Sequence, residues 1–167
     1  MDFLLIGNIV SFVGASFMIL IGLIRKKQNI LIAQCAQFGI MGVGQLFLGG
    51  VTGTVSNGVS ILRNLICLKF HFTLPLKIVF MVLQVVLTLL VRPIGVIAWF
   101  PTAAACLYTW FLDSKNEVVL KTVMIAGQLL WIAYDASIRN YSALAFDIFT
   151  VISTVVGIFL VKKNQRS

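Results

Sequence analysis

The sequence predicts an all-α membrane protein with seven transmembrane helices, and three observations support this fold class. First, 60% of the 167 residues are hydrophobic and only 11% are charged, whereas about 25% of the residues of a soluble domain are charged. Second, the apolar runs have the length of a helix that crosses a bilayer. Third, the basic residues gather in alternate loops. Most of this chain must therefore be solvated by lipid, as one membrane domain.

Seven apolar runs could each cross a bilayer as a helix, which needs roughly 17–25 mostly apolar residues and satisfies its backbone polar groups internally. The predicted spans are residues 3–24, 30–49, 52–70, 74–91, 94–112, 118–135 and 141–161. Asp2 stands where a signal peptide has basic residues, and the first run is too long for such a peptide. We therefore expect the first span to be retained.

The segments between these spans differ from them in chemistry. In chain order, the separators are residues 25–29, residues 49–53, Pro75, Pro93, residues 113–117 and Arg139-Asn140. The second separator is rich in glycine, the two prolines open the fourth and fifth spans, and the others are polar. Pro101 is expected inside the fifth span.

The basic residues predict how the chain is oriented. Ten of them fall in loops on one side: Arg25, Lys26, Lys27, Lys69, Lys77, Lys115, Lys121, Lys162, Lys163 and Arg166. Only Arg92 and Arg139 fall on the other side, and Arg63 lies within the third span. Because Lys and Arg are concentrated in cytoplasmic loops, this distribution predicts an odd number of spans with the N-terminus outside and the C-terminus inside. It also explains the net charge of +8 without a nucleic-acid partner.

The two halves of the chain contain a faint repeat. The matching segments are Ile6-Gly7 with Ile94-Gly95, Asn29 with Asn116, and Gly44-Gln45-Leu46 with Gly127-Gln128-Leu129, at offsets of 88, 87 and 83 residues. Two three-helix bundles can share one orientation only if a further helix separates them. We therefore predict a parallel 3+1+3 arrangement: residues 1–71, a linker helix in 72–92, and residues 93–167. Carriers with such repeats bind their substrates at the junction of the halves.

Asp147 and Asn57 are the leading candidates for substrate binding. Asp147 lies about two turns into the seventh span, where a carboxylate costs roughly 2.5–3.5 kcal/mol on insertion scales. It should face a cavity, pair with a cation or be protonated; a structural hydrogen bond is the alternative. Asn57 has the matching depth in the third span. It could contact substrate or, with Ser56 and Ser60, simply join helices.

Several other polar and aromatic residues within the spans are weaker candidates. Trp131 on the sixth span and Trp99 on the fifth could line the pathway, although tryptophans near span ends are often interfacial anchors. Gln45 and Gln128 should form interhelical hydrogen bonds, with pocket lining as the second interpretation. Like them, Asn8 should join helices. The glycines at positions 39, 42 and 44 should allow close helix packing.

Arg63 and Asn64 could form an inner gate. In that hypothesis, both side chains hydrogen-bond across the pathway to helix-end carbonyl groups, while Arg63 could instead extend toward the inner boundary. A direct ion pair with Asp147 is disfavoured, because six residues of depth correspond to about 9 Å along a helix.

We expect no metal and no cofactor. Cys35, Cys67 and Cys106 lie singly inside apolar segments, without the spacing of a metal or redox motif. His71 stands alone at the predicted inner boundary. The five acidic residues are Asp2, Asp113, Glu117, Asp135 and Asp147. Only the last is expected to lie deep, so we predict no paired carboxylates and no enzyme activity.

Three helices, a linker helix and three more helices, with the N-terminus outside, resemble the SWEET/PnuC superfamily of small transporters, which includes the PQ-loop proteins. The opening Ile6-Gly7-Asn8 segment and the Arg63-Asn64 pair look more like the bacterial inner-membrane proteins named after YgjV. SWEET proteins carry an asparagine on the third and seventh helices and a tryptophan on the sixth. That resemblance implies a substrate site at Asn57, Asp147 and Trp131, with a carboxyl group replacing one amide. The Pro-Gln dipeptide of the PQ-loop relatives is absent.

The favoured function is a transporter or facilitator of an unidentified small polar solute in the bacterial inner membrane, working by alternating access between the two bundles. Its predicted partners are the lipid bilayer and that solute. The carboxyl group of Asp147 also allows proton coupling. The alternative is a non-transporting membrane protein with a regulatory or sensor role. A wet cavity reaching Asn57 and Asp147 would favour transport, whereas a junction packed with Leu and Phe would favour the alternative.

Overall fold

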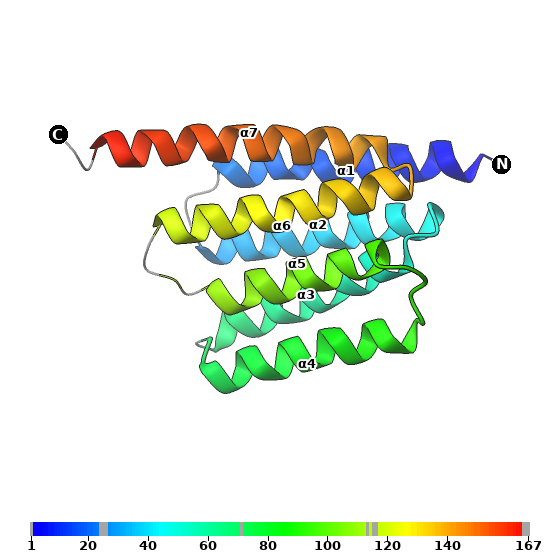
Figure 1. Cartoon of the computed structure of the whole chain (residues 1–167), viewed down its shortest axis with the longest axis horizontal. Coiled ribbons are helices and arrows are strands. Elements are labelled where there is room, and N and C mark those ends of the chain that lie inside the picture. The colour runs from blue at the N-terminus through cyan, green and yellow to red at the C-terminus, as the bar shows by residue number, and fades with distance from the viewer. Residues whose placement is uncertain (1, 24–26, 71, 113, 115–116, 165–167) are drawn as a thin grey trace.

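The structure is a computed structural model that describes residues 2–23, 27–70, 72–112, 114 and 117–164. All regular structure in these residues is helical (Figure 1). The elements are α1 (Phe3–Leu23), α2 (Lys27–Phe47), α3 (Val51–Lys69), α4 (Leu74–Leu90), the short 3-10 helix η1 (Ile97–Trp99), α5 (Phe100–Phe111), α6 (Glu117–Ser137) and α7 (Tyr141–Asn164). Except for the fifth, the predicted spans agree with these bounds to within three residues. Several residues used in the predictions lie outside the described ones: Arg25, Lys26, His71, Asp113, Lys115, Asn116 and Arg166.

The fifth helix is shorter than the predicted span of residues 94–112. Pro93 removes a backbone donor, and Gly95 has a positive φ of 82° that a helix cannot contain. The chain then forms η1 before α5 begins at Phe100. Pro101 therefore lies in the first turn of α5, where its missing N–H has no intrahelical partner to lose. The prediction of an internal proline in this span was wrong.

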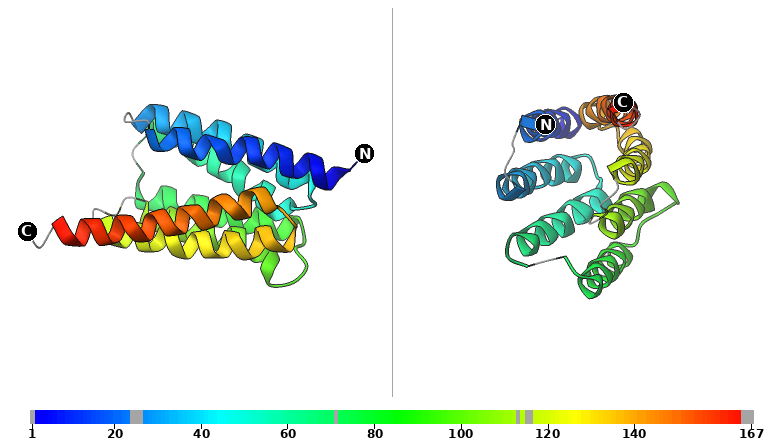
Figure 2. Two further views of the ribbon diagram at one scale, coloured as in Figure 1. Left: turned by 90° about the horizontal axis from the view of Figure 1, so that it is seen from above. Right: turned by 90° about the vertical axis from the view of Figure 1, so that its left-hand side faces the viewer.

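Six helices form a ring. Helices α1, α2 and α3 pack in that order, as do α5, α6 and α7, and the contacts α1–α7 and α3–α5 close the ring. Helix α4 packs outside the ring against α3 and α5. The end-on view in Figure 2 shows α1 beside α7, α4 at the opposite edge, and the remaining helices facing each other between them.

The distribution of polar and apolar side chains is the reverse of that in a soluble protein. The fully buried side chains with the largest volumes include Gln45, Gln84, Asn140 and Asp135, whereas residues such as Phe149, 72% exposed, face outward. By length and composition, two helices in the described residues could span a membrane, Gln28–Phe47 and Val118–Ser137. Three shorter apolar stretches accompany them: Phe3–Phe17, Leu74–Leu90 and Tyr141–Val156.

Successive helices alternate in direction, so the α2–α3 and α6–α7 turns lie together at one end of the molecule (right in Figure 1). We call this the turn end. Asn8 on α1 is also held there, because its side chain donates to the Arg139 carbonyl (3.0 Å) and accepts from the Ser142 N–H (3.2 Å). This bonding confirms the predicted interhelical role of Asn8.

Lys77 was assigned to an inner loop, and this prediction was wrong. It lies in the first turn of α4 and is buried. Its Nζ donates to the Trp110 carbonyl oxygen at 3.0 Å, at the last turn of α5. Lys77 therefore helps to hold α4 against α5, in addition to any effect of its charge on orientation.

The α2–α3 and α6–α7 turns repeat the same backbone structure 90 residues apart. The Gly50 N–H donates to the Gln45 carbonyl (2.7 Å), and the Asn140 N–H donates to the Asp135 carbonyl (2.8 Å). Each turn also contains one residue with positive φ, Gly49 and Arg139. In both turns, the helix ends with a backbone hydrogen bond to a carbonyl group five residues earlier and with one residue in the left-handed conformation.

The observed offset corrects the predicted repeat. At an offset of 90 residues (135 − 45), the counterpart of Gln45 is Asp135 rather than Gln128. The predicted offset of 83 was short by seven residues, which is about two helical turns. Such a shift keeps a residue on the same helix face but changes its depth. The predicted equivalence of Asn57 and Asp147 agrees with the turn register (147 − 57 = 90).

Close helix packing depends on Gly44 but not on Gly39. A Cβ atom at Gly44 would lie 3.0 Å from the backbone nitrogen of Ser11 and 3.1 Å from the carbonyl oxygen of Gly7. The prediction for this glycine is therefore supported by the packing of α1 on α2. A Cβ atom at Gly39 would have no neighbour within 4 Å, and one at Gly42 only ordinary contacts from 3.5 Å. The packing prediction was therefore wrong for Gly39, whereas Gly42 lies at the α2–α3 contact, which does not require a glycine.

We expect Gly44→Ala to lower the thermal unfolding temperature of the purified protein in detergent, because backbone atoms of α1 would have to move. Gly39→Ala on the same helix is the matched control. It should leave the unfolding temperature unchanged or raise it, since alanine is favoured over glycine in a helix by up to about 1 kcal/mol. Equal behaviour of the two variants would contradict this account of the α1–α2 packing.

The start of α3 is held by a side chain from α6. The Gly53 N–H is one of the first donors of α3, which have no partner within the helix. It donates to the Tyr134 hydroxyl oxygen at 2.9 Å, and Thr52 Oγ1 donates to the same oxygen at 3.2 Å. Gly53 is required for this approach, because a Cβ atom there would lie 2.7 Å from the Tyr134 ring.

Removing the hydroxyl group by Tyr134→Phe leaves the buried Gly53 donor without an acceptor. The expected cost in the free energy of unfolding is about 1–3 kcal/mol, measured by denaturant unfolding in detergent. Tyr141→Phe is the control, since Tyr141 is 59% exposed. An unchanged unfolding free energy for Tyr134→Phe would show that the hydroxyl group is not needed at the start of α3.

Candidate functional site

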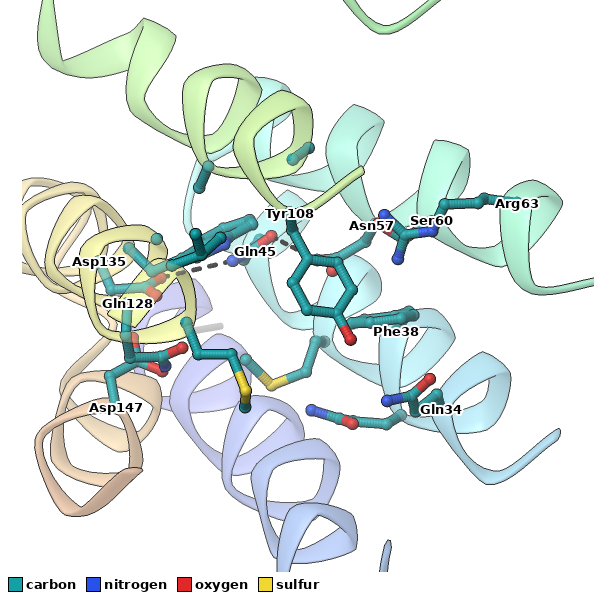
Figure 3. A pocket seen from close by; sticks show the side chains of 18 residues that line it. Gln34, Phe38, Gln45, Asn57, Ser60, Arg63, Tyr108, Gln128, Asp135 and Asp147 are labelled. Carbon is teal, nitrogen blue, oxygen red and sulfur yellow. Dashed lines mark hydrogen bonds between the residues drawn. The ribbon is translucent and has the colours of Figure 1, made fainter. Parts of the chain in front are cut away.

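A cavity of about 210 Å³ lies inside the helix ring, lined by residues of α2, α3, α5, α6 and α7. Six of the eight predicted site residues line it: Gln45, Asn57, Arg63, Gln128, Trp131 and Asp147. Asn64 and Trp99 are not among the lining residues. Figure 3 shows that the labelled polar side chains approach the cavity from several helices. The structure thus brings together residues that are up to 102 positions apart in the chain (147 − 45).

A chain of buried hydrogen bonds runs along the cavity wall near the turn end. Asn57 Nδ2 donates to Gln45 Oε1 (2.8 Å), and Gln45 Nε2 donates to Asp135 Oδ1 (3.4 Å; dashed in Figure 3). Asn140 Nδ2 donates to the same Asp135 oxygen at 3.0 Å. This chain links α3 through α2 to α6, across the ring. The predicted interhelical role of Gln45 is confirmed.

Asp147 is 6% exposed and lies beside a second carboxyl group. Gln128 Nε2 donates to Asp147 Oδ1, which confirms an interhelical hydrogen bond for Gln128 as well. Asp135 and Asp147 both line the cavity and are close enough for their charges to interact. No described residue donates to Asp147 Oδ2. Since carboxylates are acceptors only, this oxygen can accept a hydrogen bond from a ligand or bind a cation.

Asp135 is a second buried acidic residue, which the sequence analysis did not predict. Asp135 is 1% exposed, although it is only two residues from the end of α6. Its burial follows from its neighbours: Gln45 and Asn140 donate to it, and Tyr134 packs beside α3. An offset of 90 residues would have identified Asp135 as a candidate from the sequence, because it makes Asp135 the counterpart of Gln45 in the repeat.

The two halves of the repeat therefore hold different pairs at equivalent positions. Gln45 with Asn57 is a pair of amides, whereas Asp135 with Asp147 is a pair of carboxyl groups. An amide has both donors and acceptors, so the first pair bonds directly to itself. The second pair has four acceptor oxygens and, when ionised, no donor of its own, so its hydrogen bonds depend on donors from other residues or from a ligand. Equivalent backbone positions thus produce an asymmetric site.

Arg63 faces the cavity from α3 and is 3% exposed. One guanidinium nitrogen donates to Thr109 Oγ1 at 3.1 Å, and the group lies 5.1 Å from the centre of the Tyr108 ring. Its Nε has no hydrogen-bond partner in the described part of the chain. The predicted bonds to helix-end carbonyl groups were wrong for Arg63, because α5 offers a hydroxyl group and an aromatic face instead. Thr109 is two residues from the end of α5, so the side chain still extends toward the predicted inner boundary.

Asn64 and Trp99 do not line the cavity. Asn64 Nδ2 donates to Gln34 Oε1 at 3.0 Å and so joins α3 to α2, rather than reaching a helix-end carbonyl group. Trp99 belongs to η1, because the fifth helix begins later than expected. Trp131 does line the cavity, and its ring packs edge-on against Tyr134, with ring centres 5.8 Å apart.

Sequence analysis did not identify the polar stripe on α2. Gln34, Gln37, Met41 and Gln45 all line the cavity, and their spacing of three or four residues places them on one helix face. That periodicity was a usable signal, since glutamine is uncommon in the hydrocarbon region. Tyr108 was also missed, and it has no comparable pattern around it.

The cavity can hold a small solute by hydrogen bonds and charge. Its polar groups are distributed around apolar residues such as Met41 and Met124, so a ligand could be oriented at several points. Among the residues that the structure describes, no group of three His, Cys, Asp or Glu side chains could hold a metal ion.

Comparisons with known proteins identify the family. No curated protein and no solved structure matches the chain. The family model Imp-YgjV, described as bacterial inner membrane protein, matches residues 5–165, which is nearly the whole chain. The protein therefore belongs to the Imp-YgjV family of bacterial inner membrane proteins.

Proposed function

We propose that this protein transports or facilitates the movement of a small polar solute across the bacterial inner membrane. The observation that carries this proposal is the cavity inside the helix ring, with buried Asn57, Asp147 and Arg63 in its lining. Charged and amide groups at such depth are costly unless they serve a pathway or a binding site. The cavity is smaller than the 300–1,000 Å³ typical of sites for drug-sized ligands, which favours a small solute.

In this proposal, all seven helices span the membrane with the N-terminus outside and the C-terminus inside. Helices α1–α3 form the first half, α4 is the linker, and α5–α7 form the second half. The matching turns at an offset of 90 residues support a parallel repeat, and the apolar outer surface supports multiple spans. This 3+1+3 arrangement resembles the SWEET/PnuC superfamily.

Alternating access would require the halves to separate at the turn end. The hydrogen bonds that join them there are Gln45 to Asp135, Gly53 and Thr52 to Tyr134, and the two bonds of Asn8 with Arg139 and Ser142. Each such bond contributes about 0.5–1.5 kcal/mol net, so these five cost roughly 2.5–7.5 kcal/mol to open. In the lower part of that range, the open state is a populated minor state. These bonds would form the outer gate, and Asn57 and Asp147 lie just below it.

The alternative, a non-transporting regulatory or sensor protein, predicts a junction packed with Leu and Phe. The cavity and its polar lining favour a carrier over that alternative. Uptake by reconstituted protein distinguishes the two functions, because a sensor could bind a solute without moving it.

We expect liposomes containing the purified protein to accumulate a member of a panel of sugars, nucleosides, vitamins and amines. Asp147→Asn should lower that uptake at least tenfold, because it replaces a charged acceptor of the cavity while keeping its size. Asp2→Asn is the control, since Asp2 is exposed at the start of α1. Uptake is measured with and without a proton gradient. Unchanged uptake by Asp147→Asn in both conditions would remove this carboxyl group from the mechanism.

Binding can be tested separately from transport. A solute that raises the unfolding temperature of the wild-type protein should give no such shift with Asn57→Ala or Trp131→Ala, since both side chains line the cavity. Leu129→Ala on α6 is the control, because Leu129 is 54% exposed and outside the lining. If the solute raised the unfolding temperature of both cavity variants as much as that of the wild-type protein, the binding site would lie elsewhere.

A further inference from the structure

Two opposite charges face the cavity with bonding capacity that the fold does not use. Among the described residues, four buried side-chain nitrogen or oxygen atoms have no hydrogen-bond partner: Ser11 Oγ, Arg63 Nε, Gln84 Oε1 and Asp147 Oδ2. The two that belong to charged groups both line this cavity. Figure 3 shows Asp147 on one side of the cavity and Arg63 on the other.

The Asp147 side is suited to a cation. Asp147 and Asp135 supply only acceptors when ionised, and both line the cavity. The Gln45 and Asn140 amides already occupy Asp135 Oδ1, whereas Asp147 Oδ2 has no donor among the described residues. An ammonium group carries three N–H donors and a full positive charge. It would complete the bonding of Asp147 and offset the repulsion between the two carboxyl groups.

The Arg63 side is suited to an anion. Thr109 and the Tyr108 ring hold the guanidinium group in place from α5. Arginine presents planar donors that match a carboxylate, and a guanidinium held by neighbours loses little further entropy when it binds one. No acidic residue lines this side of the cavity, since the acidic lining residues are Asp135 and Asp147.

Part of the cavity wall is apolar. Met41, Ala104, Ala105 and Val123 contribute to it, beside polar residues such as Asn57. Asn57 has the depth of Asp147 in the repeat, and Arg63 follows it by six residues, or about 9 Å along the helix. A ligand that reaches both charges must therefore carry its own charges several bonds apart, and a hydrocarbon segment between them can contact the apolar part of the wall.

We infer that the cavity binds a small zwitterion whose ammonium and carboxylate groups are separated by a short hydrocarbon chain. The ammonium group lies at Asp147 beside Asp135, and the carboxylate group lies at Arg63. This inference rests on the proposed function only in taking the cavity as the solute site. It names the substrate class, which the proposed function leaves open.

The test is calorimetric titration of the full chain in detergent with a series of ω-amino acids. The probes are glycine, β-alanine, 4-aminobutyrate, 5-aminopentanoate, 6-aminohexanoate and 8-aminooctanoate. Affinity should rise with chain length to an optimum beyond β-alanine. The N-acetyl and carboxamide derivatives of the tightest probe each lose one charge and should bind at least tenfold more weakly. These comparisons use only the wild-type protein, so they do not depend on the folding of any variant.

Variants of the two charged residues then test which end of the ligand each residue binds. Asp147→Asn should remove the advantage of the free amine over its N-acetyl derivative. Arg63→Gln should remove the advantage of the free acid over its carboxamide, and Arg63→Lys should retain part of it. A reversed assignment, in which each variant affects the other end, would overturn the proposed orientation.

The inference fails if glycine binds best, if affinity does not depend on chain length, if the uncharged derivatives bind equally well, or if no member binds. Uptake by liposomes separates this failure from that of the proposed function. Accumulation of a sugar or nucleoside without binding of the series would refute the zwitterion and leave transport standing. Binding of the series without its accumulation would support the site and refute transport.

Discussion

The structure depends on one constraint: polar side chains in a lipid environment must find their partners inside the protein. In the proposed arrangement, lipid tails would surround Phe149 and the other outward-facing apolar residues, so burying more of them between helices would gain little. Glutamine, asparagine, threonine and aspartate take the interior positions that leucine and phenylalanine hold in a soluble protein. Interhelical hydrogen bonds and close backbone contacts at glycine therefore hold the helices together.

These hydrogen bonds form two groups with different consequences. Gln84 on α4 donates to Ser56 on α3 and to Thr102 on α5 (2.8 and 3.3 Å). This group fixes the outer helix α4 to both of its neighbours. The second group, Gln45 and Tyr134 with their partners, crosses the ring at the turn end. For the proposed carrier, the first group is the fixed side of the ring and the second is the side that opens.

The site shows how an internal repeat can produce chemistry that neither half has alone. The repeated turns place Asn57 and Asp147 at the same depth, but one is an amide and the other is an acid. The register likewise pairs Arg63 with Ser153 (153 − 63 = 90). The first half thus contributes the positive charge of the cavity, and the second half contributes the negative charges. A symmetric backbone therefore encloses a polarised space, which is the basis of the proposed orientation of its ligand.

The sequence by itself determined the helices other than the fifth, because the length of an apolar run is a property of a single segment. It also identified six of the residues that line the cavity, since a polar residue inside an apolar run is visible without a structure. Tertiary structure alone decided the register of the repeat, because a shift of seven residues preserves the helix face and changes only depth. It decided the burial of Asp135, the partners of Arg63 and the late start of α5, since each depends on side chains or backbone supplied by another helix or turn.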